Sequence, residues 1–446
     1  MSKTFRPWDV DQIWLLPPSV QDLVPAGHMA HFVRDTVRSG LDLSAIVDAY
    51  EEERGYPPYH PAMMTALLLY AYSQGVYSSR RIARCCEERL DFAAVTGLGH
   101  PDFRTVSDFR KRHLGALSGL FVQVLKLCRE TGLLKLGHVA LDGTRIKANA
   151  GLNKAMSYGR MKRAEQEFAE DVRDWLARAA NTDKAEDRRF GPDRRGDEMP
   201  EWVADKQKRL EKIREARAAL EAEARSAAED KAASKPDDKG LGDGGKTKPG
   251  RKPKPPATEP DDKAQRNFTD PDSRVMPTRS GFIQGYNAQA AVDGDHQIIV
   301  AHKLINTSSD QGQLAPLLDA IRANLGANPG EVSADAGYCS QANIRTLIRR
   351  RIEGYIATGR QKHGTNAAVG KRRSNSHLLE RMRAKLRRGG WRSRYRLRKQ
   401  IVEPVFGQIK QARGFRQFLL RGLDKVQCEW ALICIAHNLT KLAGAR

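Results

Sequence analysis

The sequence lacks the features that mark secreted and membrane proteins. It has only six cysteines in 446 residues, and no two of them form a CxxC pair. The longest apolar stretch, around residues 62–72, is too short to span a bilayer. The first ten residues do not follow the charged and then apolar layout of a signal peptide. We therefore expect a cytoplasmic protein whose thiols are reduced, rather than one with disulfides or a zinc site.

Aromatic residues are also few, at 7% of the chain, while hydrophobic residues make up 40%. These values suit a globular protein that carries some polar, weakly ordered stretches. A chain of this length can bury a sizeable core, and we expect two or three domains.

Acidic residues are scarce in one segment, which holds much of the formal net charge of +22. Between Lys371 and Arg421 there are 17 Lys and Arg residues but only two acids, Glu380 and Glu403. Such a block usually faces a polyanion. The alternative is a solvated tail, but interleaved apolar residues such as Tyr395 argue for a folded segment.

The first part of the chain, residues 1–130, has apolar residues at helical spacing and predicts a helical N-terminal domain. Two predicted helices, a Gly/Pro turn and a basic stretch that includes Arg104 and Arg110 resemble a DNA-binding helix-turn-helix. A basic helical bundle without that function would give the same pattern, so this assignment stays open.

A strand is predicted over residues 137–148, and it is followed by a long insertion at 151–270. Apolar stripes over 160–180 and 201–232 predict two helices that form an antiparallel hairpin. The stretch 234–262 is rich in Pro, Gly and Lys, which predicts a disordered linker.

From residue 282 onward, the patterns alternate between strand and helix. A strand pair turns at Asp293-Gly294, and then helix, strand, helix and strand follow before the basic segment. Together with the earlier strand, this order predicts an α/β fold: a mixed sheet with a helical insertion, preceded by the all-α N-terminal domain.

Three acids are candidates for a metal site. Asp142 is predicted to end the strand of "VALDG" and Asp335 that of "VSADAGY", and Glu403 is one of the two acids in the basic segment. Carboxylates that converge at a sheet edge repel one another unless a cation lies between them, and oxygen ligands suit Mg²⁺ or Mn²⁺. Each has an ordinary alternative, because Asp-Gly often forms a turn and Glu403 could simply pair with Arg396 or Lys399.

At this point the chain resembles a bacterial insertion-sequence transposase of the DDE type, whose catalytic domain has an RNase H-like fold. The segments "HVALDGTRIKANA", "ADAGY" and "VEPVFGQIK" resemble those that carry the family's two aspartates and its glutamate. The family's third motif often reads Tyr-x2-Arg-x3-Glu-x6-Lys. Glu403 and Lys410 keep its spacing, whereas Tyr395 and Arg398 come one place early. Pro404 predicts that the helix kinks or begins there.

The resemblance implies an RNase H-like catalytic domain over 131–446, with Asp142, Asp335 and Glu403 as catalytic residues that hold two Mg²⁺ or Mn²⁺ ions. It implies DNA strand cleavage followed by strand transfer into target DNA. The implied partners are double-stranded DNA, as terminal inverted repeats and as target, and a second copy of the chain on that DNA, at the bacterial nucleoid. The candidate DNA-binding residues are Lys410, Arg396, Arg398, Lys399, Tyr395, Arg413, Arg416, Arg104 and Arg110.

Two other functions remain open from the sequence. The chain could be a catalytically silent DNA-binding regulator derived from a transposase, or an RNase H-like nuclease. Strand transfer, cleavage alone and binding alone distinguish the three.

Overall fold

The computed structural model describes residues 19–50, 58–171, 173–174, 201–233, 259–278, 280–359 and 376–445. The predicted linker 234–262 lies outside these residues except for its last four positions. Among the described helices, none combines the length and the apolar character that a membrane span needs.

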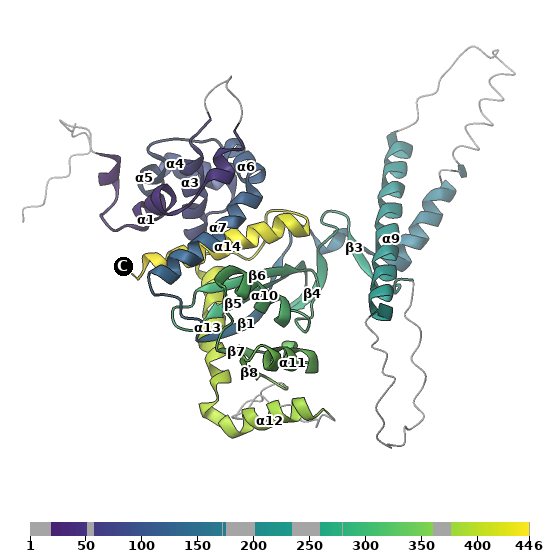
Figure 1. Ribbon diagram of the computed structural model, residues 1–446. Coiled ribbons are helices and arrows are strands. Elements are labelled where there is room, and N and C mark those ends of the chain that lie inside the picture. The colour runs from purple at the N-terminus through teal and green to yellow at the C-terminus, as the bar shows by residue number, and fades with distance from the viewer. Residues whose placement is uncertain are drawn as a thin grey trace, which may run out of the picture.

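Helices occupy the N-terminal part of the chain, as predicted (Figure 1). They are α1 Met29–Asp35, α2 Ser44–Val47, α3 Pro61–Ser73, α4 Ser79–Glu88, α5 Leu90–Thr96, α6 Phe103–Arg112 and α7 Leu114–Glu130. Helix α3 is buried over most of its length, because it is apolar on every side. It begins where the His60 side chain accepts the backbone N–H of Ala62 and Pro61 takes the first helical position.

A mixed six-stranded sheet follows. Its strands are β1 His138–Lys147, β4 Arg274–Thr278, β5 Gly281–Asp293, β6 Ile299–Ile305, β7 Glu331–Ala334 and β8 Glu353–Ile356. The order is β4-β5-β1-β7-β8, with β6 also paired to β5. Strand β1 is antiparallel to β5 and parallel to β7, which is itself parallel to β8. This arrangement confirms the predicted RNase H-like fold; β4, which extends the pairing of β5, was not predicted.

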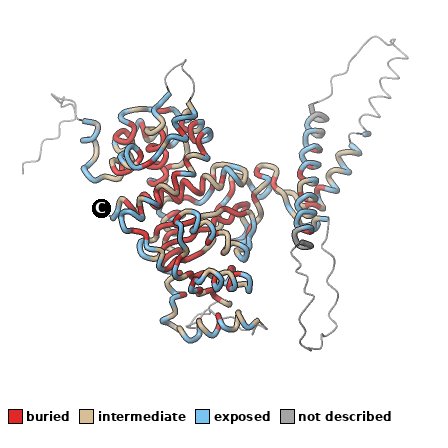
Figure 2. Tube along the Cα trace, viewed as in Figure 1, coloured by how far each residue is buried: buried red, intermediate tan, exposed pale blue. Residues whose placement is uncertain are grey.

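The second half of the chain contributes α10 Leu314–Leu325, α11 Gln341–Arg349, α12 His377–Gly389, α13 Leu397–Gly407 and α14 Leu423–Ala443. Helix α14 lies between the N-terminal helices and the sheet, packs on α7, α3 and β6, and is buried nearly throughout (Figures 1 and 2). One apolar core therefore runs without interruption from the N-terminal helices into the sheet.

The inserted segment stands to one side of this core (Figure 1). A short sheet of β2 Ala155–Ser157 and β3 Gln265–Asn267 leads to a helical stretch over 158–171 and to α9 Glu201–Ala233. The two helices share a small apolar core of their own, which includes Met161, Ile213 and Leu220. Residues of both predicted apolar stripes thus meet. The domain boundaries at 130/131 and at 151–270 remain predictions.

Candidate active site

Asp142 lies inside β1, at the position where this strand loses one of its two neighbours. The parallel pairing of β1 with β7 ends at the pair Leu141–Ala334, whereas the pairing with β5 continues to Lys147. The prediction that Asp142 ends its strand is wrong, because β1 continues to Lys147. For the same reason the ordinary alternative for Asp142-Gly143, a turn, is also wrong. The carboxylate therefore stands at the edge where β7 has ended.

Gly143 is needed for a close approach of side chains rather than for a turn. A Cβ atom at this position would collide with the Gln289 amide nitrogen and would lie 2.7 Å from Asn287 Oδ1 and 2.9 Å from Asp310 Oδ1. Three polar side chains thus crowd the backbone next to Asp142, and only a glycine leaves room for them.

Asp335 follows β7 directly. Because Leu141 pairs with Ala334, both Asp142 and Asp335 come immediately after the last pair of the parallel ladder. The Asp335 carboxylate accepts the backbone N–H of Gly337 at 2.8 Å and so begins the short 3₁₀ turn Ala336–Tyr338. The prediction that these two acids converge at one sheet edge agrees with this register.

Glu403, on α13, is linked to Asp142 by the guanidinium group of Arg398. Arg398 Nη1 donates to Asp142 Oδ2 at 2.6 Å, and Arg398 Nη2 donates to Glu403 Oε1 at 3.0 Å. The Arg398 side chain is 9% exposed, whereas that of Glu403 is 48% exposed. A buried cation therefore joins a strand acid to a helix acid at the surface. Glu403 does pair with an arginine, but with Arg398 and not with the predicted alternatives.

The helix that carries Glu403 continues through Pro404 instead of beginning there. Proline offers no N–H to the carbonyl four residues earlier, which belongs to Gln400. That carbonyl accepts the side-chain amide of Gln297 at 2.9 Å, from the β5–β6 turn. A tertiary hydrogen bond thus satisfies the acceptor that the proline leaves open.

The charges of the site are set by burial and by mutual repulsion. Burial raises the pKa of Asp142 to about 7; the Asp335 charge acts in the same direction, and Arg398 opposes both. Burial likewise raises the pKa of Asp335, and the nearby charge of Asp310 adds to it. The buried carboxylates carry more negative charge than Arg398 offsets, so a further cation would stabilise their ionised forms.

Two family models match the chain. Residues 262–439 match the family model "Transposase DDE domain", and residues 18–112 match "Transposase domain (DUF772)". The chain belongs to the DDE-type insertion-sequence transposases. Asp335 and Glu403 lie in the first matched range, whereas Asp142 lies between the two. The comparisons found no significant match to a curated protein or to a solved structure.

Arg398 and Tyr395 occupy the part of the transposase motif that departs from the family spacing. Tyr395 is 8% exposed, and burial raises its pKa. In this transposase the extra residue puts Arg398 and Glu403 five positions apart, about 140° around an ideal helix, so the two positions do not share one helix face. The two long side chains still meet, with Arg398 Nη2 3.0 Å from Glu403 Oε1.

Lys410 is tied to β1. It lies in a π-helical turn, Gln408–Ala412, that extends α13, and its Nζ donates to the Arg145 carbonyl at 2.7 Å. Burial lowers its pKa to about 8, and the Arg145 charge adds to this effect. Arg145, the residue that Lys410 contacts, lies three positions along β1 from Asp142. Whether it contacts DNA stays a prediction.

The remaining candidate DNA-binding residues divide by exposure. Arg396, Lys399, Arg416 and Arg104 are exposed. Arg110 is buried and donates to the Tyr77 carbonyl at 2.8 Å. Arg413 faces His437 on α14 at 3.4 Å. In this conformation, Arg110 and Arg413 serve internal contacts, and their role toward DNA remains a prediction, like that of the exposed four.

Sequence reasoning missed three polar residues beside the acids: Asp310, Asn287 and Gln289. The two amides are buried on β5, where Gln289 lies opposite Gly143 and Asn287 lies opposite Arg145. The available signal was two amides alternating within the otherwise apolar segment "GYNAQAAVD". Amides buried in a central strand need partners, and their partner is the Asp310 carboxylate.

The donor set fits a hard divalent cation in kind, since it offers only carboxylate oxygens. Transposases of this family generally use such ions. Within the described part of the chain, however, no three acidic, histidine or cysteine side chains already lie in a ligating arrangement. Arg398 instead supplies the positive charge between Asp142 and Glu403.

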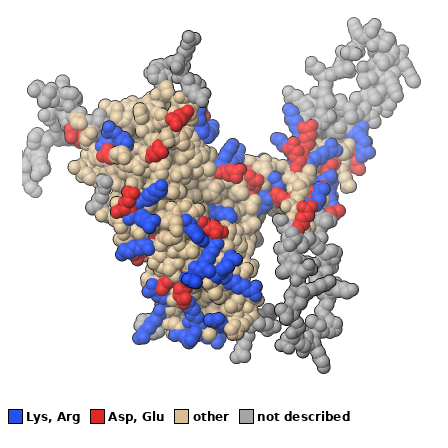
Figure 3. All heavy atoms as spheres, viewed as in Figure 1, with Lys and Arg blue, Asp and Glu red and all other residues tan. Residues whose placement is uncertain are grey.

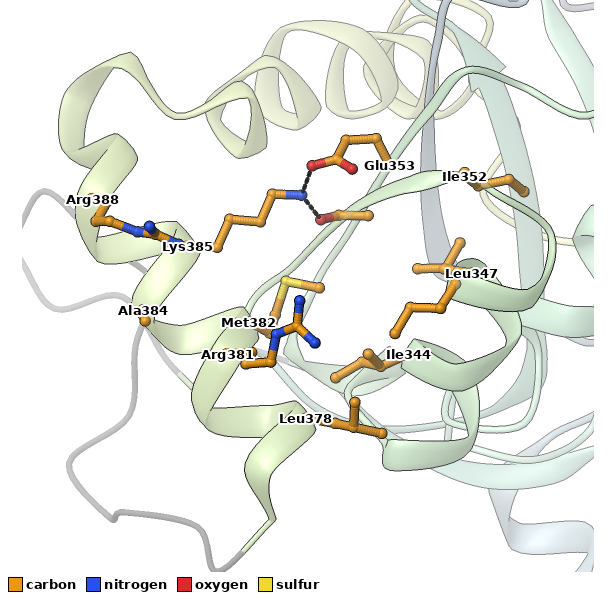
Figure 4. A pocket seen from close by; sticks show the side chains of 12 residues that line it. Ile344, Leu347, Ile352, Glu353, Leu378, Arg381, Met382, Ala384, Lys385 and Arg388 are labelled. Atoms are coloured by element: carbon orange, nitrogen blue, oxygen red, sulfur yellow. Dashed lines mark hydrogen bonds and ion pairs between the residues drawn. The ribbon is translucent and has the colours of Figure 1, made fainter.

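A cavity of about 410 Å³ lies away from these acids, between α11, α12 and β8 (Figure 4). Its floor is apolar and includes Ile344, Leu347 and Met382. Lys385 crosses its upper end and donates to the Gly354 carbonyl at 2.7 Å. None of Asp142, Asp335 and Glu403 lines this cavity.

Proposed function

We propose that this transposase cleaves DNA at the ends of its insertion sequence and joins the freed ends to target DNA. The observation that supports the proposal is that Asp142 and Asp335 follow the last pair of the β1–β7 ladder while Arg398 bonds to both Asp142 and Glu403. That last pair is Leu141 and Ala334. Arg398 links Glu403 to Asp142.

Asp142, Asp335 and Glu403 would hold two Mg²⁺ or Mn²⁺ ions, which supply Lewis acidity at the reacting phosphate. In the first step, the oxygen of water forms a new bond to phosphorus and the strand's 3′ oxygen leaves and takes up a proton. In the second step, that 3′-hydroxyl attacks a target phosphate and displaces a 3′ oxygen of the target strand.

The chain's own groups have separate tasks in this proposal. Arg398 holds Asp142 and Glu403 in place and limits their repulsion before DNA arrives. Lys410, next to β1, is placed to contact a phosphate near the cut. Two copies of the chain would be needed to cut two ends in concert, so we expect a homodimer on DNA.

The test is a Mg²⁺-dependent assay on labelled element ends with three variants, Asp142→Asn, Asp335→Asn and Glu403→Gln. Each should lose cleavage by at least about 10³-fold while it still binds the ends, because a lost carboxylate removes transition-state stabilisation but leaves the basic surface. Asp293→Asn is the matched control and should keep cleavage, because Asp293 is a buried acid at the last residue of β5 whose carboxylate accepts the backbone N–H groups of Leu136 and Asp295.

The same assay separates the alternatives. Full cleavage by any one of the three variants removes that residue from the site. Cleavage without strand transfer by the unaltered chain supports a nuclease, and binding without cleavage supports a DNA-binding regulator.

A further inference from the structure

Asp310 is a fourth acid at the proposed active site. It lies between β6 and α10, outside both of the strands that carry Asp142 and Asp335. One of its oxygens, Oδ1, accepts two hydrogen bonds, from Asn287 Nδ2 at 2.7 Å and from Gln289 Nε2 at 2.6 Å. These amides are 2% and 0% exposed, so they belong to the core of the sheet.

The strand register explains why both amides reach the same carboxylate. On β5, Gln289 lies opposite Gly143 and Asn287 lies opposite Arg145, so the two side chains alternate onto one face of the sheet. The buried Tyr338 hydroxyl donates to the side-chain oxygen Oε1 of Gln289, which fixes the donating nitrogen of the same side-chain amide toward Asp310.

The second oxygen of Asp310 faces the turn that Asp335 begins. A Cβ atom at Gly337 would lie 3.0 Å from both Asp310 Oδ2 and Asp335 Oδ1. A Cβ atom at Gly143 would lie 2.9 Å from Asp310 Oδ1. The Asp310 carboxylate thus lies between the two backbone segments that carry the strand acids, with glycines at both points of approach.

This placement costs electrostatic free energy. The charge of Asp310 raises the pKa of Asp335 and of Asp142, in each case after the larger effect of burial. An asparagine in place of Asp310 could accept the same two amide hydrogen bonds without that repulsion. Loop anchoring alone therefore does not account for an acid at this position.

We propose that Asp310 is a fourth carboxylate of the cation site, whose Oδ2, beside the turn that Asp335 begins, would help Asp142 and Asp335 to hold a divalent cation. Asn287 and Gln289 are the positioning residues that hold its Oδ1. The inference rests on the proposed function, because it assigns a further ligand to the same site. It extends the family's three acids to four.

The experiment measures Mn²⁺ binding to the full chain without DNA, by titration followed by electron paramagnetic resonance of the free ion. Asp310→Asn keeps the hydrogen-bond acceptor and removes the charge. It should weaken Mn²⁺ binding by about 10- to 100-fold. Asp310→Glu keeps the charge and should recover part of the loss. Asp293→Asn, the control, should bind as the unaltered chain does.

The positioning role has its own readout. Asn287→Ala removes one of the two hydrogen bonds to Oδ1 and leaves the carboxylate in place. It should weaken Mn²⁺ binding less than Asp310→Asn does. If Asp310→Asn does not fold, the titration is read from Asp310→Glu and Asn287→Ala, and unchanged affinity in both overturns the inference.

The outcomes separate this inference from the proposed function. If Asp310→Asn binds Mn²⁺ as tightly as the unaltered chain while Asp142→Asn and Asp335→Asn do not, Asp310 is only a loop anchor. If none of the three variants changes Mn²⁺ binding or cleavage, the proposed function fails as well.

Discussion

At the scale of single residues, burial decides which charged side chains of this transposase need partners of opposite charge. Arg398 is nearly inaccessible, yet it has two acidic partners. A buried charge without such partners would cost several kcal/mol. Arg398 and Lys399 are neighbours in the same basic segment, but Arg398 is buried and bonds to two acids, whereas Lys399 is exposed.

Glu429 gives a residue-scale prediction about pH. It is buried on α14 and accepts the backbone N–H groups of Leu419 and Leu420, yet burial raises its pKa from 4.5 to about 7. Between these two values the native state keeps the proton and the unfolded chain releases it. The free energy of unfolding should therefore fall as pH rises through this window and level off above pH 7.

The variant Glu429→Gln has no such titration and should lose less stability between pH 5 and pH 8. The expected difference from the unaltered chain is about 3 kcal/mol, at 1.36 kcal/mol per pKa unit. Urea unfolding at both pH values measures it. Parallel pH dependence in the two proteins would show that Glu429 does not titrate as described.

At the scale of elements, tertiary contacts correct what local sequence would break. Pro404 stands inside α13, and the Gln400 carbonyl that it leaves open is satisfied by Gln297. Gln297 also accepts from His437 through its backbone carbonyl, at 2.9 Å. The β5–β6 turn thus braces both the helix of Glu403 and the closing helix α14.

Gly75 gives an element-scale prediction. It follows α3 with φ +73°, and a Cβ atom there would lie 2.5 Å from the Arg413 carbonyl oxygen, just beyond the π-helical turn of Lys410. Gly75→Ala combines backbone strain with a clash against backbone, and should lower the free energy of unfolding by about 3 kcal/mol.

The matched control is Gly97→Ala, at φ +60° with no atom within 4 Å of the added Cβ. It carries the strain alone and should cost about 1 kcal/mol. If urea unfolding shows the same loss of unfolding free energy for both variants, the end of α3 does not pack against the Arg413 backbone.

At the scale of the whole molecule, one core unites parts that the sequence separates. The helices matched by one family model and the sheet matched by the other pack on α14, which closes the chain. Trp430 on this helix donates to the Gln289 carbonyl at 3.1 Å, so the closing helix also contacts the strand that positions Asp310. Loss of α14 would therefore affect the active site as well as stability.

Positive charge gathers over the lower part of the molecule in the view of Figure 3, where α12 lies. Arg381 and Arg388 are exposed, and they lie seven residues apart, on one side of the helix. If they contact DNA phosphates, each of Arg381→Ala and Arg388→Ala should reduce the salt dependence of binding, log Kd against log salt, by about 0.9.

Fluorescence anisotropy with duplex DNA over a salt series measures this slope. Arg350→Ala is the control, because its guanidinium already bonds to Asp319 at 2.6 Å. An unchanged slope in both α12 variants would place the DNA elsewhere on the molecule.

The sequence by itself determined most of the order of the elements, β4 excepted, and it predicts Asp142, Asp335 and Glu403 as the candidate acids, because periodicity, strand composition and motif spacing are local properties of the chain. Only the tertiary structure decided that Arg398 lies between two of these acids and that Asp310 lies beside them. Those placements depend on strand register and on pairing across 256 positions in the case of Asp142 and Arg398, and no local pattern encodes contacts over such a separation.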